Sequence, residues 1–245
     1  MNSQPLKDLS KLSSKGLLEQ SREIIESMAT SWNRNKSYQF RYEDQTITTQ
    51  IYTKDHLNDD YWAGRITTWS DGFSKEFKQG LFSRFMKYGV GLLESLEKSH
   101  TEYEKEYIDI FYGSKLKPFE LEETDPSYTS ISYLAECYYN LGFPLKKRVF
   151  YELIHVLKSV DGSEAYVISL AVDPSHLTDS KSSFVHAVYT SIEKFTYQNE
   201  ELSWKMCTCS DPGGLVPSYI TKLSIKNAIS KDVPSFLNWS RTKSV

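Results

Sequence analysis

The histidines and cysteines are the side chains of this sequence best suited to metal binding or nucleophilic catalysis, but their spacing matches neither. The five histidines are scattered and form no His-Glu-x-x-His pattern. His100 and Glu104 are one helical turn apart, which is more typical of a pair on a helix surface than of a metal site. Cys207 and Cys209 would share one face of a strand, yet no second cysteine pair or nearby histidine completes a zinc set. We therefore expect no metal, no cofactor and no catalytic residue, and we expect these thiols to be buried or half buried.

Two glycine-containing stretches lack the features of a phosphate-binding loop. Residues 88–91 (Tyr-Gly-Val-Gly) have no strand before them and no lysine after them. Residues 210–217 contain two glycines but no lysine, and Pro217 favours a turn that leads into a helix. A Gly-x-Ser-x-Gly nucleophile motif is also absent.

A few polar residues in apolar surroundings are better candidates for binding a ligand. Arg65 lies in the middle of a predicted strand at 61–69, and Glu193 lies in another at 184–197. The polar end of a buried ligand needs a partner, so Arg65, Glu193 and Asn227 are candidates to orient a headgroup or hydroxyl. The alternative is structural, because Arg148 and Glu193 have the charges of a pair across neighbouring strands.

Composition favours one folded domain over residues 1–245. The formal net charge of -3 and the absence of a basic stripe argue against nucleic-acid binding. The start of the sequence lacks a secretory signal, and no apolar run approaches the roughly 18–20 residues of a membrane span. The odd number of cysteines fits a reducing compartment, and the sequons at Asn35 and Asn238 are read as chance matches. We expect a cytoplasmic protein, peripheral on membranes at most.

The predicted elements come in a clear order. A helix at about 14–32, expected to cover a sheet edge, precedes a hairpin over 38–53 and the strand at 61–69. Two helices follow, with apolar spacing over 73–85 and 92–110, and the charged residues from Glu94 to Glu106 read as a solvated helix face. Strand patterns then cover 129–136, 148–158, 164–172, 184–197 and 202–208, and a final helix covers about 215–240.

The inward faces of the last strand and the last helix complete the predicted ligand site. Leu202, Trp204 and Met206 alternate with polar residues and form a dry strand face. On the final helix, one face is predicted to lie on an apolar surface. The candidates to line a ligand cavity are therefore Arg65, Glu193, Trp204, Met206, Val216, Ile220, Leu223 and Asn227.

This order of elements, with four short islands of sequence, resembles the START family of lipid-binding domains within the wider helix-grip superfamily. It is most similar to a fungal START-like group without an assigned function. The islands are residues 144–150 (Pro-Leu-Lys-Lys-Arg-Val-Phe), 189–193 (Tyr-Thr-Ser-Ile-Glu), 210–217 and 229–237. The resemblance covers about Tyr128 to Trp239 in sequence and only the order of elements before that.

The resemblance implies an α+β helix-grip fold. In that fold a curved antiparallel sheet wraps around a long C-terminal helix, with two helices inserted after the third strand and an N-terminal helix. It also implies a cavity for one lipid, of the sterol or phospholipid class, or another hydrophobic molecule. The function implied is lipid transfer or sensing at membranes, with entry gated by the C-terminal helix and a nearby loop. The sequence does not fix the oligomeric state, and we favour a monomer.

The sequence itself indicates where such a gate lies. Residues 137–147 place aromatic and apolar side chains beside two lysines, a combination suited to a membrane interface. The gate and membrane candidates are Tyr138, Tyr139, Leu141, Phe143, Lys146 and Lys147. The alternative is that these aromatic side chains pack as core beneath the loop. Lys222, Lys226 and Lys231 on the last helix are further candidates for contact with anionic lipid.

Two other function classes stay open at this point. One is a helix-grip enzyme, such as a cyclase or hydrolase, which needs two converging ionisable groups such as Glu193 with His155 or with Arg65. The other is a ligand-free interaction domain, whose cavity would be filled by its own large side chains. A family fold alone does not separate these classes.

Overall fold

The structure of the chain is a computed structural model that describes residues 1–245 except 58–59, 71, 144, 179–182, 217 and 245. Within this part, one nine-stranded sheet has the order β1-β2-β3-β9-β8-β7-β6-β5-β4, and strands adjacent in this order are antiparallel. The strands are β1 (Asn33–Tyr42), β2 (Gln45–Leu57), β3 (Asp60–Trp69), β4 (Phe111–Phe119), β5 (Tyr128–Tyr139), β6 (Arg148–Ser159), β7 (Glu164–Ala171), β8 (Val185–Gln198) and β9 (Glu201–Asp211).

The longer helices are α1 (Ser14–Ser31), α2 (Lys75–Arg84), α3 (His100–Tyr107) and α4 (Ser218–Ser240). Shorter helical turns cover Phe85–Gly89, Leu96–Lys98 and Pro174–His176. A serine side chain accepts a backbone hydrogen bond in the first turn of α1, α2 and α3, which fixes where each helix begins. These serines are Ser13, Ser74 and Ser99.

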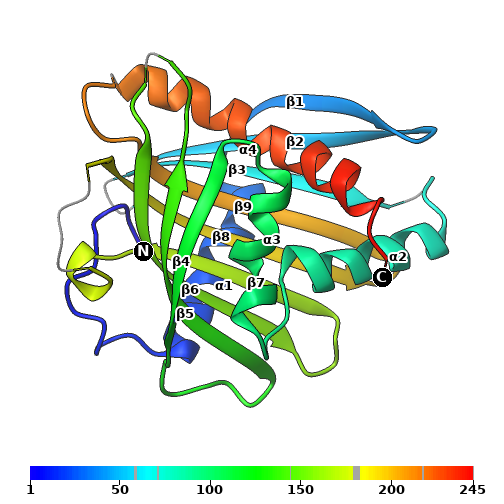
Figure 1. Cartoon of the computed structure of the whole chain (residues 1–245). Coiled ribbons are helices and arrows are strands. Elements are labelled where there is room, and N and C mark those ends of the chain that lie inside the picture. The colour runs from blue at the N-terminus through cyan, green and yellow to red at the C-terminus, as the bar shows by residue number, and fades with distance from the viewer. Residues whose placement is uncertain (58–59, 71, 144, 179–182, 217, 245) are drawn as a thin grey trace.

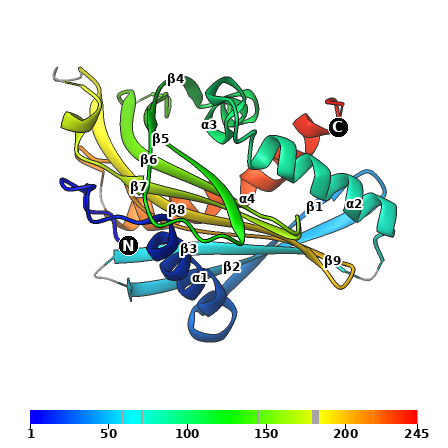
Figure 2. The same cartoon turned by 90° about the horizontal axis from the view of Figure 1, so that it is seen from below.

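The sheet separates two layers of helices. α1 packs on one face, and α2, α3 and α4 lie on the opposite face (Figures 1 and 2). Because side chains alternate along a strand, neighbouring residues belong to different layers. On β8, for example, Ile192 joins the core under α1, and Phe195 joins the core that includes Phe236 of α4. We call the face under α1 the outer face and the opposite one the inner face. This arrangement confirms the predicted α+β helix-grip fold.

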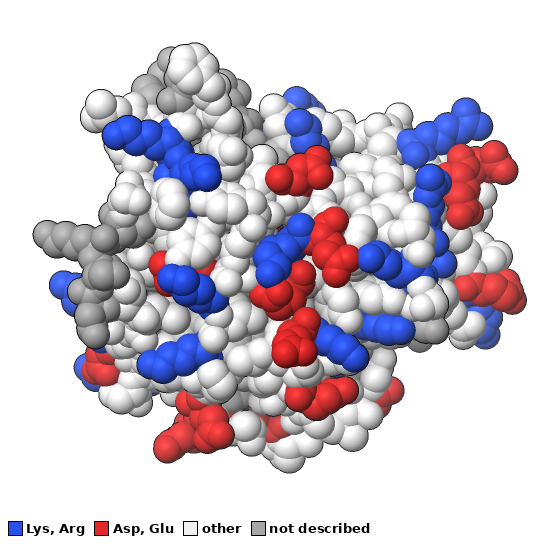
Figure 3. Space-filling model, viewed as in Figure 1, with Lys and Arg blue, Asp and Glu red and all other residues white. Residues whose placement is uncertain are grey.

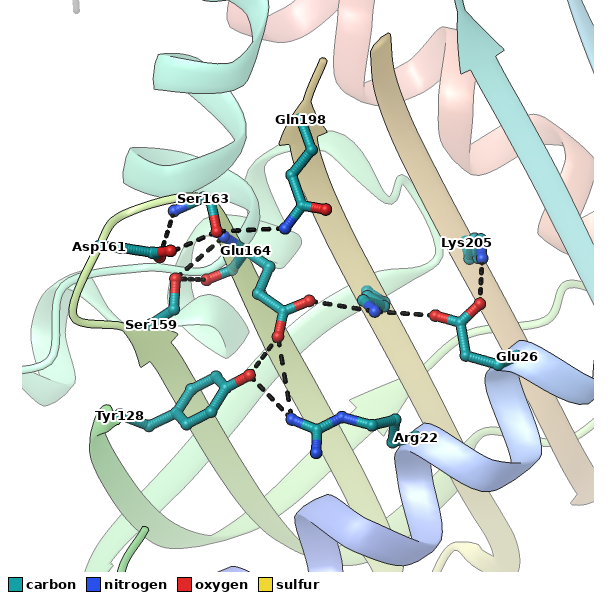
Figure 4. A network of polar contacts seen from close by, with 10 residues as sticks. Arg22, Glu26, Tyr128, Ser159, Asp161, Ser163, Glu164, Gln198 and Lys205 are labelled. Atoms are coloured by element: carbon teal, nitrogen blue, oxygen red, sulfur yellow. Dashed lines mark hydrogen bonds and ion pairs between the residues drawn. The ribbon is translucent and has the colours of Figure 1, made fainter. Parts of the chain in front are cut away.

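Ion pairs link α1 to the outer face (Figure 4). Lys194 on β8 lies 2.8 Å from Glu26 of α1 and 3.0 Å from Glu164 of β7. Glu26 also pairs with Lys205 of β9 at 2.5 Å, and Arg22 of α1 lies 3.9 Å from Glu164. We call Arg22, Glu26, Glu164, Lys194 and Lys205 the outer network. Every charge in it has a partner of opposite sign.

Three expectations about the elements are wrong. α1 covers the outer face of the sheet rather than an edge. The second predicted helix is shorter than 92–110, since only Leu96–Lys98 and His100–Tyr107 are helical. Residues 111–119 form the edge strand β4, which the sequence patterns missed because most of its residues are partly or fully exposed and show no apolar alternation.

Across the described residues, no helix is both long enough and apolar enough to cross a membrane.

Candidate functional site

The register of three central strands brings Arg65 and Glu193 to the same place on the inner face. Met206 of β9 lies opposite Arg65 of β3 on one side and opposite Glu193 of β8 on the other. Residues opposite one another in a sheet point to the same face, so these three side chains form a row. Trp204, two residues before Met206, lies on the same face. The prediction that Trp204 and Met206 face inward with Arg65 and Glu193 therefore matches their placement.

The guanidinium of Arg65 is enclosed by this row. The residue is 0% exposed, and its guanidinium carbon lies 3.9 Å from the centre of the Trp204 ring. Arg65 Nη2 lies 3.7 Å from Glu193 Oε2, and Trp204 Nε1 donates a hydrogen bond of 2.7 Å to that same oxygen. Among the described residues, the Arg65 guanidinium nitrogens have no hydrogen-bond partner. Burial lowers the pKa of Arg65, and the nearby Asp232 and Glu193 carboxylates oppose that effect.

Three further acids are linked electrostatically to this pair: Asp232 to both members, Glu104 to Glu193, and Glu152 to Glu104. Sequence reasoning missed all three as site residues. Glu104 comes from α3, Glu152 from β6 and Asp232 from α4. Burial raises the pKa of Glu104 and of Asp232 to about 7, and it raises the pKa of Glu152 well above its usual range. We call Glu104, Glu152, Glu193 and Asp232 the acidic cluster.

Two members of the acidic cluster are enclosed by protein yet keep accessible surface. Glu104 retains 26% of its side-chain exposure, and Asp232 is half buried. Desolvation is nevertheless the main cause of the raised pKa of both carboxyls. Both carboxyls are therefore partly accessible in surroundings that oppose their ionisation.

Tyrosines surround the acidic cluster. Burial, together with the nearby carboxylates, raises the pKa of the Tyr107, Tyr139 and Tyr189 phenols well above 10.0.

Tyr139 was a gate-loop candidate, but it lies in β5, where its ring stacks on Phe111 with centroids 4.5 Å apart. Its assignment to the loop is corrected, because β5 continues three residues beyond the predicted end of the strand at Glu136.

The apolar face of α4 differs from the predicted one. Ile225, Ile229, Val233, Phe236 and Leu237 are the buried residues of the helix that pack in the inner cores. Ile220 is 41% exposed and Asn227 is exposed, so the prediction that they pack on the sheet is wrong. Asn227 instead accepts a hydrogen bond from the Tyr38 hydroxyl. Val216 precedes the helix and lines a cavity of about 230 Å³ with Tyr61, Cys209 and Lys222 among others. Pro217 and the side chain of Leu223 lie outside the described part of the chain.

The remaining gate candidates lie at the end of the molecule where β5 joins β6. Phe143 is 101% exposed, Lys146 and Lys147 are exposed, and Leu141 is half buried. Tyr138 lies in β5 and turns toward the outer core. The β9 to α4 loop lies beside this loop (Figure 1), and the Arg148 side chain donates a 3.1 Å hydrogen bond from Nε to the Pro212 carbonyl. Arg148 thus holds the two loops together, and its expected pairing with Glu193 is replaced by the pairing of Glu193 with Arg65.

His155 does not converge with Glu193, because it belongs to the other side of the sheet. Its Nε2 lies 2.9 Å from the Ser14 hydroxyl of α1 and its Nδ1 lies 2.8 Å from the Ser132 hydroxyl of β5. Burial lowers the pKa of His155 to about 4. The ring is 1% exposed, so it joins α1 to the sheet rather than serving a ligand. The proposed catalytic pair of Glu193 and His155 is therefore wrong.

His100 and Glu104 also differ from expectation, since they turn inward rather than lie on a helix surface. His100 is buried, its Nδ1 lies 2.6 Å from the Gly89 carbonyl and its Nε2 lies 3.7 Å from Glu104 Oε2. Cys207 and Cys209 are buried free thiols, as expected. Within the described ranges, no three His, Cys, Asp or Glu side chains are placed to hold a metal ion.

Solved structures of START domains share this fold at low sequence identity. Human STARD10 matches with a TM-score of 0.63 and 12% identity, over 94% of this chain and 80% of that chain. Human StAR-related lipid transfer protein 5 matches with a TM-score of 0.59 and 10% identity, over 94% and 98% of the two chains. A StAR-related lipid transfer protein fragment from Xanthomonas axonopodis matches with a TM-score of 0.54 and 11% identity, over 86% and 98%. The predicted START fold is confirmed.

Sequence comparison adds the family. No curated protein matches the chain. A family model described as "Protein of unknown function (DUF3074)" matches residues 62–240, which run from β3 through the whole of α4. Arg65 and the acidic cluster all fall inside the matched region. The chain therefore belongs to the DUF3074 family, with the helix-grip fold of START domains.

Proposed function

We propose that the chain binds one lipid or similar hydrophobic molecule in a cavity between the inner face and α4, and that it exchanges this ligand at membranes. The observation that carries the proposal is the acidic cluster, whose Glu104 and Asp232 carboxyls are surrounded by protein yet keep accessible surface. Such side chains need a space beside them. A ligand there explains why a fold of this kind retains ionisable groups in its interior.

Apolar and polar residues divide the proposed cavity into two zones. Trp204 and Met206 supply the apolar wall, and the partly exposed carboxyls of Glu104 and Asp232 mark the polar zone. A buried polar group that lacks a partner costs about 1–3 kcal/mol, so a ligand with a polar end at this zone is favoured over a pure hydrocarbon.

The proposed route for exchange is the end of the molecule at the β5 to β6 and β9 to α4 loops. Phe143 and Leu215 are each 101% exposed, one in each loop, and Leu145 is 39% exposed. Lys146 and Lys147 lie beside them, and Figure 3 shows basic but no acidic side chains at this upper left corner of the view. Apolar side chains beside cations suit insertion into an anionic bilayer surface. Lys231 on α4 is exposed, whereas Lys222 pairs with Asp55 at 3.2 Å.

Lipid capture tests the binding part of the proposal. The purified chain is incubated with a total lipid extract, reisolated by size exclusion and analysed by native and then denaturing mass spectrometry. We expect one lipid class at close to one molecule per chain. A folded protein that carries no lipid would contradict the proposal and favour a ligand-free domain.

Vesicle binding tests the exchange part. Phe143→Ser with Leu215→Ser should weaken binding to vesicles that contain anionic lipid by roughly tenfold or more, because each side chain loses an apolar contact with the bilayer. Val160→Ser is the matched control, since Val160 is 69% exposed and follows β6 at its opposite end. Equal binding by all variants, or binding indifferent to anionic lipid and salt, would remove the proposed route.

A further inference from the structure

We propose that the ligand of this cavity carries an amino or ammonium group, which the carboxyl groups of Glu104 and Asp232 bind. The inference rests on the proposed function and names the chemical class of its ligand. The chain thus takes an apolar amine, and it takes a fatty acid or other anionic amphiphile of the same length poorly.

The balance of charge around the cavity is the first argument. The acidic cluster brings four carboxyl groups to the inner face, from α3, β6, β8 and α4, and Arg65 lies beside two of them, Glu193 and Asp232. Among the described residues, Arg65 and His100 are the basic groups that act on Glu104, Glu152 or Asp232. The interior therefore has more acidic groups than basic partners for them.

Access is the second argument, since the one arginine is not free to meet a ligand. Arg65 is 0% exposed, lies over the Trp204 ring and faces Glu193. Glu104 keeps 26% of its side-chain exposure and Asp232 is half buried. A ligand in the cavity therefore meets carboxyl groups before it meets the guanidinium.

Aromatic rings are the third argument. Tyr107, Tyr139 and Tyr189 lie near enough to Glu104 for its charge to affect their phenols, which burial keeps protonated. The face of a neutral aromatic ring attracts a cation, with a stronger effect where water is excluded. An ammonium group among these rings and carboxyls gains both kinds of contact.

The protonation of the cluster points the same way. Burial raises the pKa of Glu104 and of Asp232 to about 7, so without a ligand these carboxyls resist ionisation. A bound ammonium favours the ionised form and gains charge-assisted hydrogen bonds. A bound carboxylate would instead add a further negative charge to the group.

Binding of three amphiphiles with one chain length tests the inference. Dodecylamine, dodecanol and dodecanoate are titrated into the full chain near neutral pH and below their micelle concentrations, with tryptophan fluorescence and calorimetry as readouts. We expect dodecylamine to bind roughly tenfold or more tightly than dodecanol, and dodecanoate to bind most weakly.

Variants locate the group that binds the amine. Glu104→Gln and Asp232→Asn should each weaken dodecylamine binding by roughly tenfold and leave dodecanol binding unchanged, which also shows that the variants fold. Glu106→Gln is the matched control, because Glu106 is exposed on the same helix.

Two results would overturn the inference in different ways. If the three amphiphiles bind equally, or dodecanoate binds most tightly, the amine preference is wrong while ligand binding itself stands. If none of them binds to the folded chain, and lipid capture also finds no ligand, the proposed function fails with it.

Discussion

The outer and inner faces of the sheet carry ionisable residues from the same strands but balance them differently. On β8, Glu193 points to the inner face, and its neighbour Lys194 points to the outer face. Lys194 contacts Glu26 and Glu164 within 3.0 Å, and the interactions with Tyr166, Glu26 and Glu164 outweigh burial and raise its pKa. Glu193 shares Arg65 with Asp232, and among the described residues no basic group acts on Glu152. The outer face, on which every charge of the outer network has a partner, holds α1. On the inner face the acids outnumber their basic partners, and a ligand would complete the contacts there.

The two faces should also respond to pH in opposite directions. The pKa of Glu104 and of Asp232 is raised to about 7 from 4.5 and 3.8, so the folded state holds protons that the unfolded state has released. Their contribution to stability is therefore lost as pH rises from about 4 to 7. The pKa of His155 is lowered to about 4 from 6.5, so its contribution is present above pH 6.5 and is lost as pH falls toward 4.

The largest effect should come from breaking the outer network. Lys194→Met leaves Glu164 without its 3.0 Å partner at a site that is 14% exposed, and it takes one of two lysines from Glu26. We expect the free energy of unfolding to fall by about 2 kcal/mol, because the partly buried Glu164 carboxylate keeps only the more distant Arg22, at 3.9 Å, as an ion-pair partner among the described residues. Urea denaturation at pH 7.5 measures it. A loss below about 0.5 kcal/mol would mean that the network does not hold α1.

The opposite sign is expected on the inner face. Asp232→Asn removes a carboxyl that must ionise while enclosed by Arg65, Glu193 and Glu104. Near pH 8 we expect the variant to be more stable than the wild type by on the order of 1–2 kcal/mol, and below pH 4 we expect no gain. Urea denaturation across this range checks the slope. An equal change at both pH values would show that Asp232 does not titrate between them.

A smaller effect is expected from the histidine that links α1 to β5. His155→Gln keeps one of two hydrogen bonds, to Ser14 or to Ser132, so about 1 kcal/mol should be lost at pH 7.5. The difference from the wild type should shrink toward pH 4.5, where the buried ring of the wild type resists protonation. A difference that grows in acid would contradict the assignment.

The smallest effect should come from Lys205, the second lysine of the outer network that pairs with Glu26. Lys205→Gln removes a 2.5 Å ion pair with Glu26, whose side chain is 44% exposed and keeps Lys194 as a partner. We expect a loss of about 0.5 kcal/mol that disappears in high salt, because solvent screens this pair. A loss as large as that of Lys194→Met would show that the two lysines are not distinguished by burial.

The sequence predicts the sheet better than it predicts the site. Strands β5 to β9 lie close to their predicted ranges because β-branched and aromatic residues alternate between clear turns, and this alternation also places Trp204 and Met206 correctly. The exposed edge strand β4 offers no such pattern. The face of α4 is wrong because Ile220, near the start of the helix, is apolar but exposed, so spacing counted from it selects the opposite face.

The acidic cluster shows what a single sequence does not reveal. Glu104 lies in a run of charged residues and reads as part of a solvated helix face, and only the packing of α3 against the sheet turns it inward. Asp232 and Glu152 did leave a signal, because each stands among residues that are buried on the same element. An acid at such a position is unusual for core and indicates either a pair or a site.

The most direct test of the contrast between the two faces is to titrate the side-chain carboxyl groups by NMR in protein labelled at Asp and Glu. We predict that Glu104 and Asp232 titrate with apparent pKa values near 7, that these signals vanish in Glu104→Gln and Asp232→Asn, and that the pKa of Glu26 lies below 4.5. If all of these carboxyls titrate between about 3 and 5, the charges on the inner face are as well paired as those on the outer face. The claimed contrast between the two faces would then be wrong.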